Sequence, residues 1–278
     1  MYKARIKTDA GKIFDFSYEN GVVFDIAPLS GTDVSVTASQ GFNQIGETVT
    51  GQSVAGIRRT ISGVILYEAT AKAMLSVLPA FTTGMLTVND SYFCNFTVQK
   101  TPEIVRNKNG RLVFSMQIFC DTPFWLRSQE AAFTMNVYNA LFSFPVKYNT
   151  HKFGETIESG YLDIKNDGDM SVPYTLEITS KGTSKNYGII NILTGEHIRF
   201  NDTLLSGETV IFKRSRGKIT AIKTDGNQNY NIVGTIADDS TLFDMRTGSN
   251  MIRVIADEGE SVLSAIISFY PAYMGVIA

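Results

Sequence analysis

Short runs in which apolar residues recur at every second position dominate the chain and predict β-structure. The clearest run covers residues 112–120 and follows Asn109-Gly110, a dipeptide favoured in tight hairpin turns. A shorter run at residues 94–98 repeats the pattern and predicts the pairing strand. The alternating positions of the longer run indicate that one face of this strand lies on a core: Leu112, Phe114, Met116, Ile118 and Cys120.

One segment in the first half has a helical pattern instead. Residues 67–78 are rich in helix-forming side chains, and Pro79 follows directly as a common helix stop. Apolar residues at helical spacing predict one buried stripe, made of Leu66, Ala69, Ala73, Met74 and Val77. We therefore predict a single helix near residues 67–78.

The stretch from Gly31 to Gly56 is extended in character, punctuated by glycine and poor in large apolar side chains. Because such a stretch makes a poor core strand, it predicts a hairpin or arm that reaches onto another subunit by strand addition. Its large apolar residues are candidates for a subunit interface, namely Phe42, Ile45 and Val49. Deletion of residues 41–51 is expected to weaken assembly.

The pair Arg58-Arg59 follows within an apolar run. Consecutive strand residues point to opposite faces, so only one of the two can face a core or a partner. A solvated edge strand and an ion pair to another subunit both fit this pattern. Both arginines therefore join the interface candidates.

Beyond Glu130 the chain is a regular series of short β runs separated by turn residues, with no helical segment between them. Strands at this spacing are typical of an antiparallel sandwich. The chain is thus expected to be mainly β, with an N-terminal β domain at residues 1–130 and a sandwich at residues 131–278. Glycine-containing signals predict the turns of the second domain: residues 166–169, 194–195, 206–207 and 225–227.

Composition and charge exclude several functional classes. Hydrophobic residues make up 44% of the 278 residues, charged residues 19%, and the formal net charge is −2. A dedicated nucleic-acid binder would show a basic excess, so no sequence-specific nucleic-acid binding is expected. The longest apolar stretch, residues 264–278, is too short to span a bilayer and contains Pro271, and the first residues lack a signal-peptide core. Neither a leader nor membrane insertion is expected.

The sequence contains no pattern typical of catalysis or of metal binding. Its two histidines, His151 and His197, lack ligand spacing, and the glycine loops that bind phosphates or dinucleotides are missing. The acidic pairs at residues 238–239 and 257–260 lie in turn-like stretches. We therefore expect no catalytic residue, cofactor or metal. The two cysteines are interpreted as two separate thiols, buried or half-buried.

Residues 118–128, IFCDTPFWLRS, place Cys120 beside Asp121 and contain the only tryptophan. A neighbouring carboxylate raises a thiol pKa, so Asp121 argues against a nucleophilic Cys120. The segment is instead interpreted as a joint. Its Pro123, Phe124 and Trp125 are expected to pack at the junction of the two domains.

Several short elements, taken in their order along the chain, resemble a known family. They are Cys120 to Trp125, the Asn166, Gly168 and Pro173 that open the second half, and the Gly248 and Asn250 before the last strands. In this order they resemble the distal tail protein of long-tailed phages (siphoviruses) and prophages of Gram-positive bacteria. The resemblance covers nearly the whole chain.

The resemblance implies a non-enzymatic virion protein of the tail tip or baseplate, made in the cytoplasm of the bacterial host. It implies a six-fold ring at the end of the tail tube, with a channel for DNA and a galectin-like C-terminal sandwich. The implied partners are further copies of the chain, the tail tube protein, and a tail-tip fibre or tail-associated lysin. Receptor-binding proteins are also implied. The alternative interpretation is a carbohydrate-binding adhesin module without enzymatic activity.

Overall fold

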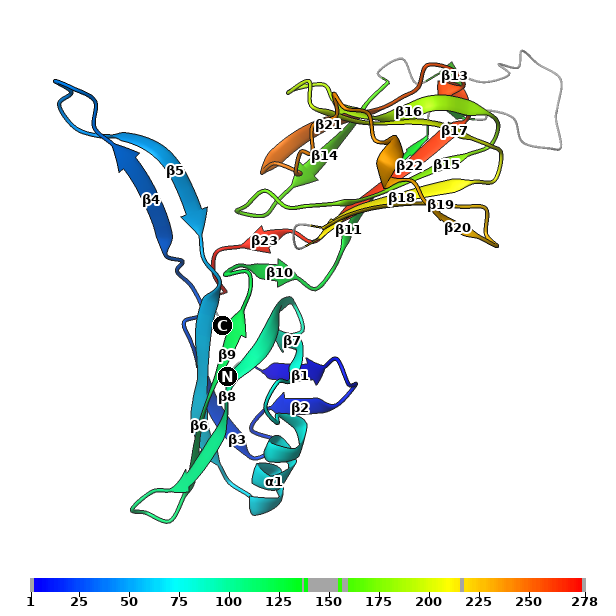
Figure 1. Cartoon of the computed structure of the whole chain (residues 1–278). Helices are drawn as coiled ribbons and strands as arrows, with labels where there is room; N and C mark the ends of the chain where they lie inside the picture. The colour runs from blue at the N-terminus through cyan, green and yellow to red at the C-terminus, as the bar shows by residue number, and fades with distance from the viewer. Residues whose placement is uncertain (1–2, 137, 140–154, 157–159, 216–217, 277–278) are drawn as a thin grey trace. The chain divides into compact units, whose positions relative to one another are not determined.

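The structure is a computed structural model that describes residues 3–136, 138–139, 155–156, 160–215 and 218–276. It divides into two compact units (Figure 1). The first comprises Met1–Gln129 together with Ala272–Ala278, and the second comprises Glu130–Pro271. His151, one of the two histidines considered above, lies outside the described residues.

The first unit is built on a nine-stranded sheet in the order β2-β1-β7-β8-β9-β6-β3, with β10 pairing to both β8 and β23. All of its strand pairs are antiparallel. The strands are β1 (Ala4–Thr8), β2 (Ile13–Phe16), β3 (Val22–Ala27), β6 (Ile57–Ile65), β7 (Thr83–Val88), β8 (Tyr92–Arg106), β9 (Leu112–Cys120), β10 (Trp125–Arg127) and β23 (Ala272–Tyr273).

The predicted hairpin is confirmed as β8 and β9. Gly110 adopts a positive φ of 75°, and its N–H donates to the carbonyl oxygen of Asn107 at 2.9 Å. Every second residue of β9 from Phe114 onward is buried, while Leu112 is half-buried. Cys94, Phe96 and Val98 of β8 are buried too, so both strands present one face to the same core.

The predicted helix is confirmed as α1 (Glu68–Val77), the single α-helix of the described residues. Its buried face is formed by Thr70, Ala71, Met74 and Val77. The predicted stripe is therefore wrong at three positions, since Leu66, Ala69 and Ala73 are exposed. The helix is rotated because the Thr70 hydroxyl faces the body and donates to the carbonyl oxygen of Asn20 at 3.1 Å.

The predicted arm is an isolated β-hairpin of β4 (Val34–Ser39) and β5 (Thr48–Val54). These two strands pair with each other and, among the described residues, with no further strand. Nearly all of their residues are exposed. Figure 1 shows the hairpin leaving the large sheet beside the start of β6. We call residues 34–54 the arm.

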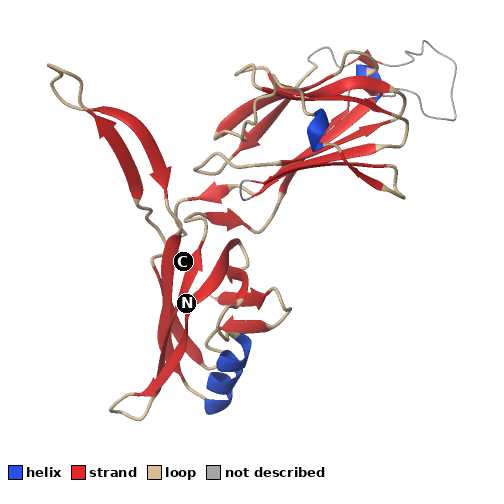
Figure 2. Ribbon diagram, in the orientation of Figure 1, coloured by secondary structure: helices blue, strands red, loops and turns tan. Residues whose placement is uncertain are grey.

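The second unit is an antiparallel sandwich (Figure 2), as the sequence predicts. Ring centroids of Phe200 and Phe212, from opposite sheets, lie 6.2 Å apart in its core. The six-stranded sheet is β11 (Ala131–Asn136), β22 (Leu263–Phe269), β15 (Thr175–Ser180), β18 (Thr209–Ser215), β19 (Lys218–Thr224) and β20 (Asn229–Asn231). The four-stranded sheet is β14 (Leu162–Asn166), β21 (Gly248–Ile255), β16 (Ser184–Asn191) and β17 (His197–Leu204).

Smaller elements complete the second unit. They are the pair β12 (Tyr138–Asn139) and β13 (Glu155–Thr156), and the 3-10 turns η1 (Val233–Thr235) and η2 (Glu260–Val262). Positive φ at Gly195, Gly207 and Gly226 agrees with three of the predicted turns. No helix in the described residues is both long and apolar enough to cross a membrane.

The end of the chain departs from the expected division. Residues 131–278 were expected to form the second domain, but the residues after Pro271 belong to the first unit. The reason is strand pairing, because Tyr273 of β23 lies opposite Trp125 of β10. In addition, the Val276 N–H donates to the carbonyl oxygen of Leu29 at 3.2 Å.

Candidate interaction surface and the cluster at its base

The tip of the arm presents two large apolar side chains to solvent. Phe42 is 98% exposed and Ile45 is 103% exposed. Large exposed apolar residues that lie together typically mark a surface that binds a partner. Along the strands, four valines are also exposed: Val34, Val36, Val49 and Val54. All three predicted interface residues of the arm thus lie on its surface, and their role in assembly stays a prediction.

The tip has a defined local structure rather than an open loop. The Gln44 side chain accepts from the Gly41 N–H at 2.9 Å and donates to the Thr48 hydroxyl at 2.8 Å. Asn43 and Gly46 adopt positive φ values of 60° and 88°, which let the chain turn sharply on either side of Ile45. These polar contacts hold the backbone of the tip and leave its apolar side chains without an intramolecular core.

At the base of the arm, Arg59 of β6 is buried, with only 1% of its surface exposed. Its Nη1 donates to the carbonyl oxygen of Pro28, and its Nη2 donates to that of Pro123 at 2.7 Å. Its guanidinium carbon lies 4.3 Å from the centroid of the Trp125 ring. The prediction that Arg59 is an interface residue is therefore wrong, because its side chain is buried inside its own unit.

Arg58 has the opposite environment. It is exposed, its Nε donates to Oε1 of Gln99 at 3.1 Å, and its guanidinium lies 5.8 Å from the Phe119 ring. The idea of a solvated edge strand is wrong, since β6 lies between β3 and β9 in the sheet. A contact between Arg58 and another subunit stays a prediction.

Trp125 is fully buried in the first unit. Its indole Nε1 donates to the carbonyl oxygen of Leu29 at 2.9 Å, and its strand lies between β8 and β23. The described contacts of Trp125 are thus with residues of its own unit. The Asp121 side chain accepts from the Thr122 N–H at 3.0 Å, which fits the expected turn. The junction role of Pro123 and Phe124 stays a prediction.

The two cysteines are not separate, contrary to expectation. Cys94 and Cys120 are both fully buried, and their sulfur atoms lie 3.6 Å apart. The hydrogen bond with the Cys94 thiol and the nearby positive charge of Arg59 lower the pKa of Cys120, although burial and Asp121 oppose this. The expected effect of Asp121 has the right sign, but it is a minor one. Alternation along β8 and β9 places both thiols on the inward face, so this signal was present in the sequence.

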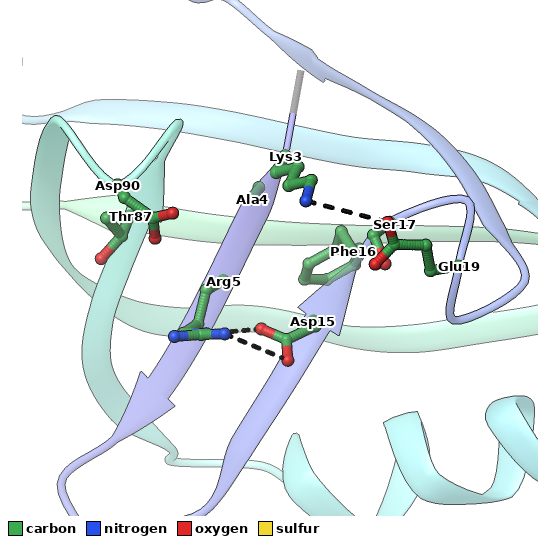
Figure 3. Close-up of a pocket in the computed structure, with 9 residues that line it drawn as sticks. All are labelled: Lys3, Ala4, Arg5, Asp15, Phe16, Ser17, Glu19, Thr87 and Asp90. Carbon is green, nitrogen blue, oxygen red and sulfur yellow. Dashed lines mark hydrogen bonds and ion pairs between the residues drawn. The ribbon is translucent and has the colours of Figure 1, made fainter. Parts of the chain in front are cut away.

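Figure 3 shows a small depression in the surface of the first unit. It encloses about 130 Å³ beside β1 and β2, and opposite charges line it. Nε of Arg5 lies 2.5 Å from Oδ1 of Asp15, and Nζ of Lys3 lies 3.9 Å from Oε1 of Glu19. Because these charged groups are exposed and already paired, the depression provides few free polar groups to bind a ligand.

The described residues show no constellation for metal chemistry. Among them, no three His, Cys, Asp or Glu side chains gather closely enough to hold a metal ion. Nε2 of His197 instead lies 3.4 Å from Oδ2 of Asp239 at the surface of the second unit. These side chains therefore serve as surface polar contacts.

Comparison with solved structures finds a similar fold over both units. The chain superposes with a TM-score of 0.70 on Dit (gp 19.1) of phage SPP1. That protein is described as a paradigm of the hub adsorption apparatus in phages that infect Gram-positive bacteria. The match covers 98% of this chain and 99% of that protein at 9% identity. The chain has the fold of the Dit hub protein.

A chain of the phage p2 baseplate in its activated conformation with strontium is also similar to this Dit-like chain. Its TM-score is 0.50 at 12% identity, over 97% of this chain and 98% of that one. The calcium form of the p2 baseplate gives 0.50 at 13% identity, over 96% and 98%. No protein-family model matches the chain, and no curated protein matches its sequence. The Dit-like fold is therefore visible in the structure although neither a family model nor a curated protein matches the chain.

Proposed function

We propose that this protein is the structural hub at the distal end of a phage tail. In this role, copies of the chain form a ring, six-fold by analogy, that joins the tail tube to the tail-tip proteins and leaves a channel for DNA. The main support is the likeness to the SPP1 hub protein over 98% of the chain. The protein then works in the virion as a connector and not as an enzyme.

The arm supplies the physical means of ring closure. It exposes Phe42 and Ile45 almost completely, and both of its strands have an edge that no described strand covers. A neighbouring copy can cover these apolar side chains and complete the hydrogen bonds of an edge by strand addition. The near-neutral charge of −2 suits a ring through which DNA slides, because tight phosphate contacts need many Lys and Arg side chains.

The carbohydrate-binding alternative gains no support from the tryptophan. A sugar platform commonly uses an exposed aromatic ring, whereas Trp125, the only tryptophan of the chain, is fully buried. Receptor-binding proteins, a tail-tip fibre or lysin and the tube protein are the partners we propose for the hub.

The ring is tested by light scattering over a concentration series, followed by negative-stain imaging. We expect the unaltered chain to form a closed oligomer. The double variant Phe42→Ser/Ile45→Ser should raise the dissociation constant of this oligomer by at least about tenfold, because two anchor side chains contribute about 1.4 kcal/mol or more. Phe81→Ser is the matched control, because Phe81 is 93% exposed but lies outside the arm.

Two different results would contradict the ring and the role of the arm. A chain that stays monomeric at every concentration, alone and mixed with tail tube protein, contradicts the ring. An oligomer that survives in the double variant, or that dissociates equally in the Phe81 control, contradicts the role of the arm and leaves the ring intact.

A further inference from the structure

The buried thiols of Cys94 and Cys120 face each other across neighbouring strands. Their sulfur atoms are in van der Waals contact at 3.6 Å, one on β8 and the other on β9. A disulfide bond is about 2.05 Å long, so closure requires the sulfurs to approach by roughly 1.5 Å. No other cysteine exists in the chain to compete for either partner.

Among the described residues, the arginine that acts on these thiols has no carboxylate as counter-ion. Arg59 is 1% exposed, and in the described residues it forms no ion pair with a carboxylate. It donates to two carbonyl oxygens, packs on the Trp125 ring and acts on both thiols, and its Nε has no hydrogen-bond partner. A buried positive charge without compensation is costly, so an adjacent anion is favoured. A thiolate is the anion that this cluster can provide.

The surroundings of the two thiols shift their pKa values in opposite directions. The hydrogen bond with the Cys120 sulfur and burial raise the pKa of Cys94. The hydrogen bond from the Cys94 thiol and the charge of Arg59 lower the pKa of Cys120. The charge of Arg59 also lowers the pKa of Cys94, so the difference between the sulfurs depends on their shared hydrogen bond, in which we assign the proton to Cys94 and the nucleophile to Cys120. A nucleophilic thiolate next to a second thiol is the arrangement in which oxidation ends in a disulfide.

We infer that Cys94 and Cys120 form a redox modification site, in which a peroxide links β8 and β9 by a reversible disulfide. The Cys120 thiolate attacks one oxygen of hydrogen peroxide, the O–O bond breaks, and the leaving hydroxide takes up a proton to become water. This gives a sulfenic acid on Cys120. The Cys94 sulfur then attacks the Cys120 sulfur, the S–O bond breaks, and the hydroxyl leaves as water with the Cys94 proton. Two thiols and one peroxide thus give one disulfide and two waters.

The only tryptophan reports on this reaction. Trp125 packs on Arg59, and the charge of Arg59 acts on both thiols. Formation of the disulfide removes the thiolate charge and moves the sulfurs, so the environment of the indole changes. The emission of Trp125 therefore follows the state of the pair in the folded chain.

The test treats the folded full-length chain with hydrogen peroxide. We expect the intact mass to fall by about 2 Da and the thiols that titrate after denaturation to fall from two to zero, both reversed by dithiothreitol. The tryptophan emission should change with the same rate constant. Two thiols that survive in the folded chain, or disulfide-linked dimers in place of the internal bond, overturn the inference.

Single variants separate the roles of the two sulfurs. Cys94→Ala should leave Cys120 able to form a sulfenic acid, which dimedone traps, without any loss of 2 Da. Cys120→Ala should leave Cys94 at least about tenfold slower toward peroxide, since it lacks the activated thiolate. Circular dichroism verifies that both variants fold. Equal reactivity of the two single variants would assign the oxidation to nonspecific thiol chemistry.

Discussion

Asn250 in β21 fixes a turn of the second unit from inside. It is fully buried, and its Nδ2 donates to the carbonyl oxygens of Arg246 at 2.8 Å, Gly248 at 3.2 Å and Ile164 at 3.3 Å. Its Oδ1 accepts from the Arg246 N–H at 3.0 Å. One side-chain amide thus replaces backbone partners that a tight turn cannot supply, which gives a physical reason for an asparagine at this position.

Asn250→Ala should therefore destabilise the second unit strongly. It leaves buried carbonyl and N–H groups without partners, and each such group costs about 1–3 kcal/mol. We expect a clear fall in the urea midpoint followed by circular dichroism. Asn201→Ala, at an exposed position of β17, is the control and should change little. Equal midpoints for the two variants would show that the buried amide is dispensable.

Asn166 acts in the same way at the end of β14. Its Nδ2 donates to the carbonyl oxygens of Met170 and Met245, both at 3.0 Å, and its Oδ1 accepts from the Gly168 N–H. Gly168 is not among the positive-φ glycines, so the turn depends on the asparagine and not on the freedom of the glycine. The sequence marked both positions as part of a resemblance, but it gave no sign of which atoms they hold.

Arg59 shows the limit of residue-level prediction. Strand alternation correctly requires Arg58 and Arg59 to face opposite sides, but it does not say which one is buried. The answer depends on the carbonyl oxygens of Pro28 and Pro123, which only the folded chain brings together. Long-range polar partners of this kind leave no local pattern.

At the scale of elements, prediction from sequence succeeds where one signal dominates. The arm was predictable because it lacks core residues, and the β8–β9 hairpin because alternation and turn chemistry agree. The buried face of α1 was predicted with an error of about one position, because alanine is small enough to lie on either side of the boundary. The burial of Thr70 depends on its hydrogen bond to Asn20, which helical periodicity does not encode.

Gly63 tests how closely β6 and β3 approach. A Cβ at this position would lie 2.0 Å from the carbonyl oxygen of Val23 and 2.7 Å from Cα of Phe24. Gly63→Ala must therefore move β6 and the terminal strand β3 apart, and overpacking of this kind costs about 1–3 kcal/mol or more. We expect a lower urea midpoint by tryptophan fluorescence.

Gly51→Ala is the matched control for this substitution. Gly51 is also a strand residue of the first unit, but its Cβ would meet only Thr37, at an ordinary 3.8 Å. The control should keep the midpoint of the unaltered chain. If Gly63→Ala keeps it as well, the strands can separate more easily than this packing implies.

At the scale of the whole molecule, the first unit is discontinuous. It contains the residues before Glu130 and those after Pro271, and the entire sandwich is inserted between them. The boundary near residue 130 could be placed from the change in pattern along the chain. The return of β23 could not, because a two-residue strand is too short to produce a periodic signal.

Removal of residues 272–278 should weaken the first unit alone. The truncation takes away one of the two partners of β10 and the contacts of Gly275 and Val276 with Ser30 and Leu29. We expect a red-shifted emission of Trp125 and a lower urea midpoint by fluorescence. Leu193→Ser, at an exposed position of the second unit, should leave both unchanged. A truncated chain with unaltered fluorescence would show that β23 contributes nothing to the unit.

The discontinuity also sets an order of events during synthesis. A ribosome that makes roughly 5–20 residues per second needs on the order of ten seconds to pass through the inserted unit. Throughout that time the backbone of Leu29 and Ser30 lacks its partners Val276 and Gly275. The segment before the arm thus gains these two contacts only after the sandwich has been translated, whereas the bond from Trp125 to Leu29 can form earlier. A nascent chain therefore holds the base of its arm with fewer contacts until the sandwich has been made.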